Sequence, residues 1–441
     1  MRYSNELKKK LKKEGIRTGD RIRVSYKQKK YDGILMPRTG TDEKDIIILK
    51  LDSGYNIGLE LSGDFSIEKV DSRKEKKGHE TIKSISIEKE TEKDVAILIA
   101  GGTIASRVDY RTGAVKPSVD EEELVSFAPR IAGIANIEAK KIIETLSENV
   151  SPDDWVTIAK AVKKEIENGK DGVVVAHGTD TMGYTAAALS FVFEDLPIPV
   201  VLTGSQRSSD RGSSDSHQNL TCAVKAATTE VAEVMVCMHG ERSDTFCYLH
   251  PGTKTRKMHT SRRDAFRTIN ADPYAKVHWE GLGVEMIRSD YRKKDKKRRV
   301  KIKEHFEENV EMVKIYPGMD PDIFKKQLEK TEGVIVEGTG LGHLPTNNKK
   351  IMEALKKYNE EENIAFMASQ CLNGRVNMNI YETGIDLQST GVIGNLNDML
   401  PETAYVKLAW LLGNYNKEEA KDLMTENMRG EITERSSQTK L

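Results

Sequence analysis

The hydrophobic residues of this chain follow two different patterns, one before and one after residue 94. In the first part, short segments alternate polar and apolar residues, as in Arg21-Ile22-Arg23-Val24, and turn residues such as Asp32-Gly33 separate them. Alternation of this kind is typical of half-buried strands, and several short strands at this spacing predict a small antiparallel β-barrel. The predicted strands cover residues 20–26, 31–36, 46–51 and 55–59.

From residue 94 onward, continuous apolar segments replace the alternation. Such segments suit parallel strands that are buried on both faces of a sheet. Helical patterns lie between them, at residues 153–168 and 181–193, so strand and helix alternate as they do in α/β proteins. The predicted buried strands are Val95–Ala100, Gly172–Ala176, Ile198–Leu202, Val234–Met238 and Gly333–Val336.

The fold class that we expect is α/β, with two domains built on parallel sheets and a small all-β barrel domain before them. Residues 71–93 are rich in Lys, Glu and Ser and are interpreted as a linker that contains at most one strand, near residues 82–87. A second, basic linker is expected at residues 286–310. Its basic stretch, 291–299, is either a solvated connector or a contact surface for RNA or a partner. The expected domains are therefore 1–70, 94–285 and 311–441.

The charge and hydropathy of the chain exclude several classes of protein. The 441 residues include 69 Lys and Arg and 69 Asp and Glu, so the formal net charge is zero. No overall field attracts nucleic acid or membranes, and any RNA contact must come from a local patch or from a partner. The N-terminus is a run of Lys and Glu, and no apolar stretch reaches the roughly 18 residues of a membrane helix. We therefore expect a cytoplasmic protein without membrane contact.

The cysteines do not predict a metal site. They form no CxxC pair, and the histidines near them lack zinc-finger spacing. We expect buried, reduced thiols and no bound metal. The four residues are Cys222, Cys237, Cys247 and Cys371.

Three polar motifs follow predicted strands, and the carboxyl ends of parallel strands are where α/β proteins bind ligands. The first motif is Gly101-Gly102-Thr103. Its glycines allow a sharp turn and a close approach of substrate, and a threonine hydroxyl at this edge can act as a nucleophile. Taken alone, the motif also suits an ordinary glycine turn in which Thr103 caps a helix.

The second motif is His177-Gly178-Thr179-Asp180-Thr181, and the third centres on Lys257. A carboxylate beside a hydroxyl can hold a substrate amino group or position a proton relay, although Asp180 could also simply cap the helix that follows. The histidine is more often a packed residue than a base. A lysine can serve as a base where its surroundings favour the neutral amine, but a lysine in a basic region is weak evidence by itself.

Together, the segment Gly101–Ala105 and the segment His177–Thr181 resemble the double signature of the L-asparaginase family. The resemblance covers roughly residues 94–430 and implies an α/β amidohydrolase. Further matching segments are Leu202–Arg207, Ser147-Glu148-Asn149, Lys257 nine residues before Phe266, and the Tyr316–Met319 opening of the last domain.

This resemblance implies a role for each residue of the first two motifs. Thr103 becomes the nucleophile, on a flap loop that continues to Tyr110, which helps to activate it. Thr179, Asp180 and Lys257 become a second, hydrogen-bonded group. The substrate is then the side-chain amide of glutamine or asparagine, which is attacked to release ammonia.

The resemblance also implies a set of residues that bind the substrate. Ser147 and Glu148 would hold the α-carboxylate and α-amino ends, with Gly178 beside them in the second motif. Glu148 stands where many members of the family have glutamine, so the resemblance does not specify its exact contact. Backbone N–H groups of the two Gly-Thr loops are expected to stabilise the oxyanion.

A small β domain before an asparaginase-like body resembles the D subunits of archaeal glutamyl-tRNA(Gln) amidotransferases. That resemblance implies that a partner, the E subunit of such an amidotransferase, uses ATP and Mg to activate Glu-tRNA(Gln) and receives the ammonia. This chain has no GxxxxGK[ST] loop and is expected to bind no cofactor. A homodimer within a heterotetramer is implied as well.

Two alternatives stay open at this point. The first is a free-standing L-asparaginase with a regulatory N-terminal domain. The second is a catalytically inactive scaffold or RNA-binding protein that keeps the fold, against which the presence of all four candidate catalytic residues speaks.

Overall fold

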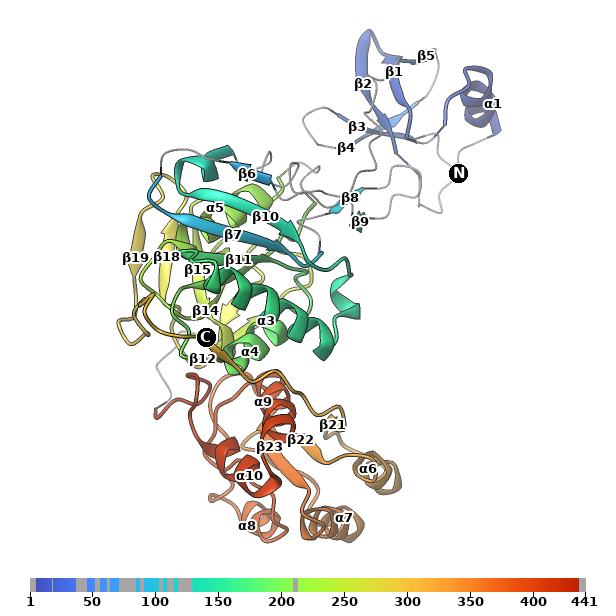
Figure 1. Ribbon diagram of the computed structural model, residues 1–441. Coiled ribbons are helices and arrows are strands. Elements are labelled where there is room, and N and C mark those ends of the chain that lie inside the picture. The colour runs from blue at the N-terminus through green and yellow to red at the C-terminus, as the bar shows by residue number, and fades with distance from the viewer. Residues whose placement is uncertain are drawn as a thin grey trace.

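The computed structural model divides the chain into parts that follow one another from the N-terminus to the C-terminus (Figure 1). A small β domain comes first, a large α/β domain second and a smaller α/β domain last. This confirms the expected fold class. The described residues are 5–17, 19–36, 46–51, 56–61, 64–70, 85–87, 91–102, 106–108, 115–117, 129–208 and 213–435.

The small domain is a five-stranded antiparallel sheet with strand order β4-β3-β2-β1-β5. Alternation along β1 places Ile22 and Val24 in the core, where Leu7 and Leu11 of helix α1 join them. Sequence reasoning missed this helix, because five lysines surround the two leucines whose spacing of four marks its apolar face. The elements are α1 (Asn5–Lys13), β1 (Arg21–Tyr26), β2 (Lys29–Leu35), β3 (Ile46–Lys50), β4 (Asn56–Glu60) and β5 (Phe65–Lys69).

The large domain contains a nine-stranded sheet of order β19-β18-β15-β14-β13-β11-β7-β10-β6. The five strands from β14 to β10 are parallel, and four of them were predicted as such, whereas β10 was not predicted. The strands beside these five run antiparallel. The connection from β14 to β15 is too short for the crossover that a parallel pair needs. The strands are β6 (Ile85–Ile87), β7 (Asp94–Ile99), β10 (Asn136–Lys141), β11 (Gly172–Ala176), β13 (Val200–Thr203), β14 (Val234–His239), β15 (Phe246–Pro251), β18 (Ala275–His278) and β19 (Val284–Met286).

Helices cover both faces of this sheet, which is why its central strands are apolar throughout. Along β11, Val173 and Val175 face the core formed with α3 and α4, and Val174 and Ala176 face the core formed with α5. The remaining elements are α3 (Pro152–Glu167), α4 (Met182–Val192), α5 (Ser216–Ala227), η2 (Pro129–Gly133), η3 (Ser147–Asn149), η4 (Gly252–Lys254), β8 (Ser106–Val108), β9 (Val115–Pro117), β12 (Phe193–Glu194), β16 (Thr255–Lys257), β17 (Phe266–Thr268) and β20 (Lys301–Ile302).

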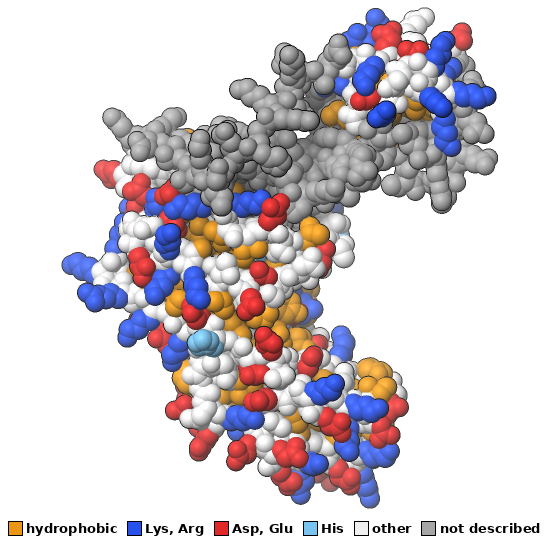
Figure 2. All heavy atoms as spheres, turned by 45° about the vertical axis from the view of Figure 1, so that its right-hand side comes forward, with side chains coloured by type: hydrophobic (Ala, Val, Ile, Leu, Met, Phe, Trp, Pro, Cys, Tyr) orange, Lys and Arg blue, Asp and Glu red, His pale blue; other side chains and the backbone are white. Residues whose placement is uncertain are grey.

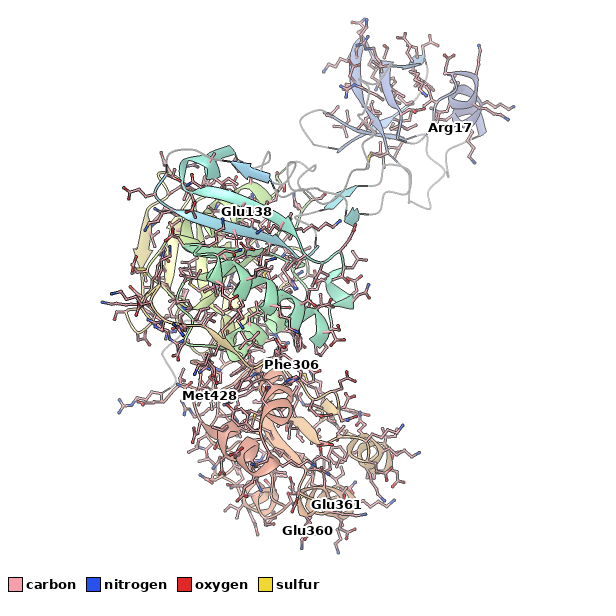
Figure 3. All side chains as sticks on the ribbon, viewed as in Figure 1. Arg17, Glu138, Phe306, Glu360, Glu361 and Met428 are labelled. Atoms are coloured by element: carbon pink, nitrogen blue, oxygen red, sulfur yellow. The ribbon has the colours of Figure 1, made fainter. Side chains whose placement is uncertain are left out.

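The last domain is built on three parallel strands, β21-β22-β23, and shares its core with the large domain. Trp410 stacks on Phe191 with 5.7 Å between the ring centroids. Phe306, labelled at the junction in Figure 3, packs edge to face against Trp155. The elements are β21 (Val310–Lys314), α6 (Pro321–Leu328), β22 (Gly333–Gly338), α7 (Lys349–Glu360), β23 (Ile364–Ser369), α8 (Glu382–Gln388), α9 (Pro401–Asn414) and α10 (Lys417–Thr425).

The basic stretch 291–299 is not a fully solvated connector. Lys294 Nζ lies 2.8 Å from Asp171 Oδ1 with its side chain only 7% exposed, and Lys296 Nζ lies 3.0 Å from the same oxygen. Burial alone would raise the pKa of the Asp171 carboxyl, but these lysines and the Asp94 amide lower it to about 2. The buried acid therefore holds part of the stretch against the large domain.

Three of the cysteines, Cys222, Cys237 and Cys247, are buried free thiols as expected. Cys371 is exposed, contrary to the prediction, because it lies in the loop after β23 and not within a strand. Within the part of the chain that the structure describes, no helix combines the length and the apolar character needed to cross a membrane.

Candidate active site

Three neighbouring strands of the large sheet, β7, β11 and β13, end at the same level. The first motif follows β7, the second motif follows β11, and the segment Gly204-Ser205-Gln206 follows β13. The middle strand, β11, pairs its Ala176 with Ile99 of β7 on one side and with Thr203 of β13 on the other. The loops that follow these strands therefore begin side by side. This is the edge at which ligands of α/β proteins bind.

Glycines allow two of these loops to touch. A Cβ atom on Gly102 would lie 2.4 Å from the Cα atom of Gly178, and one on Gly101 would lie 2.2 Å from the carbonyl oxygen of Thr145. Both glycines of the first motif also have positive φ angles, +81° and +91°, which other residues rarely adopt. The first motif thus needs its glycines for two separate reasons.

Thr103, the predicted nucleophile, and Tyr110, its predicted helper, lie outside the described residues. Gly102 directly precedes Thr103 in the sequence and is described. The residue directly before Thr103 is therefore in contact with the loop of the second motif.

The structure brings Thr179, Asp180 and Lys257 together, although the lysine is 77 and 78 residues away from the other two. Lys257 Nζ donates a hydrogen bond of 2.9 Å to Thr179 Oγ1 and one of 2.6 Å to Asp180 Oδ1. The lysine side chain is 14% exposed and the aspartate side chain 63% exposed. The ammonium thus links a buried hydroxyl to a carboxylate that faces solvent.

Two contacts fix the strand that carries Lys257. Strand β16 pairs with β17, where Lys257 lies opposite the buried Phe266. The neighbouring Arg256 forms an ion pair of 2.7 Å with Glu402 at the start of α9. Sequence reasoning missed this pair, because no pattern in the chain links a basic strand to a helix of another domain.

The residues predicted to bind substrate border the second motif. Ser147 is buried, and its Oγ accepts a hydrogen bond of 3.0 Å from the Thr181 amide, while Thr181 Oγ1 donates to the Ser147 carbonyl at 2.8 Å. A Cβ atom on Gly178 would lie 2.5 Å from Ser147 Cβ. Glu148 is exposed next to them. Thr181, which belonged to the motif but was given no role, ties the two segments together.

His177 is a packed residue, as interpreted from the sequence. It is fully buried, with Nδ1 2.7 Å from the Gly178 carbonyl oxygen and Nε2 3.0 Å from Thr185 Oγ1. Burial lowers the pKa of its imidazole, which favours the neutral form. A metal site is a separate question. The described part of the chain contains no group of three or more His, Cys, Asp or Glu side chains that could hold a metal ion.

The sequence matches known families over three segments. Residues 94–291 match the family "Asparaginase, N-terminal", residues 309–424 the "Glutaminase/Asparaginase C-terminal domain", and residues 16–70 the "GatD N-terminal domain". The D subunit of the glutamyl-tRNA(Gln) amidotransferase of Pyrococcus furiosus is 48% identical over 429 residues, which cover 96% of each chain. The D subunit of Methanothermobacter thermautotrophicus is 45% identical over 440 residues, 99% of each chain. The chain belongs to the family of glutamyl-tRNA(Gln) amidotransferase D subunits.

Solved structures of L-asparaginases resemble a large part of this member of the D-subunit family. The thermostable L-asparaginase from Thermococcus kodakarensis aligns with a TM-score of 0.69 and 31% identity, and L-asparaginase I from Vibrio cholerae with 0.67 and 29%. Each alignment covers 78% of this chain and 100% of the asparaginase. The D-subunit family thus adds further chain to an asparaginase fold.

Proposed function

We propose that this chain is an amidase that uses Thr103 to release ammonia from the side-chain amide of glutamine or asparagine. The ammonia is used to convert Glu-tRNA(Gln) to Gln-tRNA(Gln), in keeping with the name glutamyl-tRNA(Gln) amidotransferase of its relatives. The observation that carries the proposal is the contact of Lys257 with Thr179 and Asp180, beside the glycine turn that leads into Thr103.

In the first half of the reaction, Thr103 Oγ attacks the amide carbon of the substrate. The C–N bond breaks, the hydroxyl proton passes to the departing nitrogen, and ammonia leaves an ester on Thr103. A threonine hydroxyl needs a neighbouring group to take its proton, and we assign Tyr110 to this step. Backbone N–H groups of the two Gly-Thr loops stabilise the oxyanion, and losing one such donor typically costs about 2.7–4 kcal/mol.

In the second half, water attacks the ester, and the acid product leaves with Thr103 restored. Thr179 Oγ1 accepts a hydrogen bond from Lys257, so its own proton is free to be donated, and the ammonium strengthens it as a donor. A charged lysine cannot accept a proton. The 2.6 Å contact gives Lys257 an acceptor in Asp180, after which the amine can take the proton of the attacking water through Thr179. As the ester C–O bond breaks, this proton is returned to the Thr103 oxygen, which restores the hydroxyl.

Binding of the amino-acid end of the substrate is assigned to the loops around Ser147. We assign Ser147 and the Gly178 backbone to the α-carboxylate, and Glu148 to the α-amino group. Glu148 and Asp180 are both exposed carboxylates at this edge, which suits an ammonium group. A pocket distinguishes glutamine from asparagine by only about 1–3 kcal/mol, since they differ by one methylene.

The chain acts in a complex. The word subunit in the names of its relatives supports this, and the absence of a GxxxxGK[ST] loop from the sequence agrees with it. We assign activation of Glu-tRNA(Gln) with ATP and Mg to a partner, the amidotransferase E subunit, that receives the ammonia. Two copies of each chain would form a heterotetramer.

Ammonia release by variants of Thr103 tests the proposal. Thr103→Ala should lower release from both amides by roughly 10³-fold or more, whereas Thr157→Ala, on the exposed face of α3, should leave it unchanged. The assay measures ammonia from glutamine and asparagine with and without the E subunit and Glu-tRNA(Gln). Amidase activity of Thr103→Ala at the wild-type level would refute the assignment of the nucleophile.

A free-standing L-asparaginase is the second candidate function. The full coverage of solved L-asparaginases by this fold supports it. The two functions differ in coupling, because an amidotransferase subunit should release ammonia faster when the partner and Glu-tRNA(Gln) are present. If the chain by itself releases ammonia fast, and the rate does not change when the partner and Glu-tRNA(Gln) are added, the result would favour the free-standing enzyme.

A further inference from the structure

The charge of this chain is unevenly distributed. Although the formal net charge is zero, the first 36 residues contain 12 Lys and Arg and 4 Asp and Glu. This end of the chain therefore carries a formal charge of +8, and the remaining residues carry a formal charge of −8. A local positive field can attract polyanions even where the whole molecule is neutral.

Most of these cations lie on two elements of the small domain. On α1, Leu7 and Leu11 face the core, which leaves the lysines of this helix toward solvent. The hairpin between β1 and β2 carries Lys27, Lys29 and Lys30, all exposed. Figure 2 shows Lys and Arg side chains spread over the visible face of this domain.

A hollow of about 450 Å³ lies between the β1–β2 hairpin and the start of β5. Lys27, Lys29 and Lys30 line it together with Phe65. Lys10 of α1 lies 3.8 Å from the centroid of the Phe65 ring, so the helix places a further cation next to a residue of this lining. One carboxylate, that of Asp64, lies in the lining, so the three lysines outnumber it.

The hairpin lysines are not used in ion pairs that hold the domain together. Other cations of the domain do form such ion pairs. Arg23 forms two hydrogen bonds of 2.7 Å with Asp32, and Lys69 contacts Asp20 at 2.8 Å. Lys27, Lys29 and Lys30 form no ion pair with any residue that the structure describes. Their charge is available to a ligand.

The turn of this hairpin has an unfavourable conformation for its residues. Tyr26 pairs with Lys29, which leaves Lys27 and Gln28 as a two-residue turn with φ angles of +48° and +61°. Such a turn favours Asn-Gly, since both positions need positive φ. Long side chains at strained positions are a reason to look for a function there.

We propose that this surface, the basic hairpin face (Lys10, Lys27, Lys29 and Lys30 around Phe65), binds the phosphate backbone of RNA. Unpaired lysines around a hollow match the spaced charges of a nucleic-acid strand, and the Phe65 ring at its wall suits a sugar or base. The identification of this RNA as the tRNA of the reaction rests on the proposed function. The chain would then contact the tRNA itself, in addition to any contact made by a partner.

The test compares binding of labelled tRNA(Gln) transcript by the full chain and by its Lys27→Gln/Lys29→Gln/Lys30→Gln variant. The variant should bind at least about tenfold more weakly, and the slope of log K against log salt should fall by about 2–3, since each lost phosphate contact removes roughly 0.7–0.9. Fluorescence anisotropy over a series of salt concentrations measures both quantities.

The matched control removes the same charge from α7 of the last domain. Lys350, Lys356 and Lys357 lie there beside acidic partners, among them Glu360 and Glu361, labelled in Figure 3 at the opposite end of the molecule from Arg17. The triple change of these lysines to Gln should leave tRNA binding within about twofold of the wild type. Equal losses in both triple variants would mean attraction by bulk charge alone and would overturn the proposal.

Two further measurements separate the possible failures. Gln28→Gly relieves the turn and keeps every lysine, so it should raise the melting temperature of the small domain and leave tRNA binding unchanged. Basal ammonia release from glutamine should be the same in all these variants.

If the hairpin variant binds tRNA normally but fails to bind the E subunit, the face docks a protein and the proposal is wrong. If Thr103→Ala keeps its amidase activity while the hairpin variant loses tRNA, only the proposed function fails.

Discussion

Gly102 and Gly178 are in direct backbone contact, so close that a Cβ atom on Gly102 would lie 2.4 Å from the Cα atom of Gly178. The two glycines come from loops that are more than 70 residues apart in the chain and follow neighbouring strands. Their contact leaves no room for a side chain between the turn that leads into Thr103 and the loop that carries Thr179. It sets the distance between the two parts of the candidate site.

Replacement of Gly102 by alanine should therefore separate these loops. The new methyl group meets backbone atoms that cannot rotate away, and the φ of +81° is unfavourable for alanine as well. We expect ammonia release to fall by about 100-fold and stability by about 1–3 kcal/mol. Gly133→Ala is the control, because a Cβ atom there meets nothing within 4 Å. Full activity of Gly102→Ala would contradict the close contact.

Lys257→Met should reduce the rate of ammonia release without unfolding the protein. The lysine contacts Asp180, whose side chain is 63% exposed, so the ion pair should contribute no more than about 1 kcal/mol to stability. Loss of a proton-transfer group typically lowers the rate about 10²–10⁴-fold. Steady-state assays and thermal melts measure the two effects. A large drop in melting temperature with a normal kcat would assign Lys257 a structural role instead.

The buried pair of Lys254 and Asp398 should stabilise the junction of the two α/β domains. Lys254 Nζ lies 3.1 Å from Asp398 Oδ1, both side chains are fully buried, and the Thr433 amide donates to the same oxygen at 2.9 Å. Lys254→Met leaves a buried carboxylate without its cation and should cost about 3–5 kcal/mol in urea unfolding. Lys254→Met/Asp398→Leu should recover part of this loss. A double variant less stable than the single one would contradict this account.

The free energy of unfolding of the protein should decrease at acidic pH because Asp171 becomes protonated. Its pKa of about 2 lies below the value of about 3.9 for an unfolded aspartate, so the folded state binds fewer protons. The stabilisation is therefore complete above about pH 4 and is lost as the pH falls toward about 2. Because one of its two lysine partners, Lys296, is 47% exposed and therefore screened by water, we expect about 1–2 kcal/mol. Urea unfolding between these pH values should show a shallower pH dependence for Asp171→Asn, and an unchanged profile would contradict the assignment.

The sequence predicted five buried strands and two helices of the α/β domains, those with the clearest continuous apolar segments and helical periodicity. It failed where a local signal was weak or misleading. Helix α1 was hidden by its lysines, and the antiparallel margins of the large sheet depend on short connections and not on composition. The basic stretch was interpreted as a solvated connector or as a contact surface for RNA or a partner. Its ion pairs with Asp171 were missed, because this acid lies more than 120 residues before Lys294 in the chain.

The candidate site divides in the same way. The sequence by itself determined which residues are available for chemistry, because motifs of glycine, threonine, aspartate and lysine can be read locally. Only the tertiary structure decided that Lys257 reaches Thr179 and Asp180 and that Arg256 forms an ion pair with Glu402. Distances between such residues depend on strand order and register, which are set by the packing of the whole core and are written in no single segment.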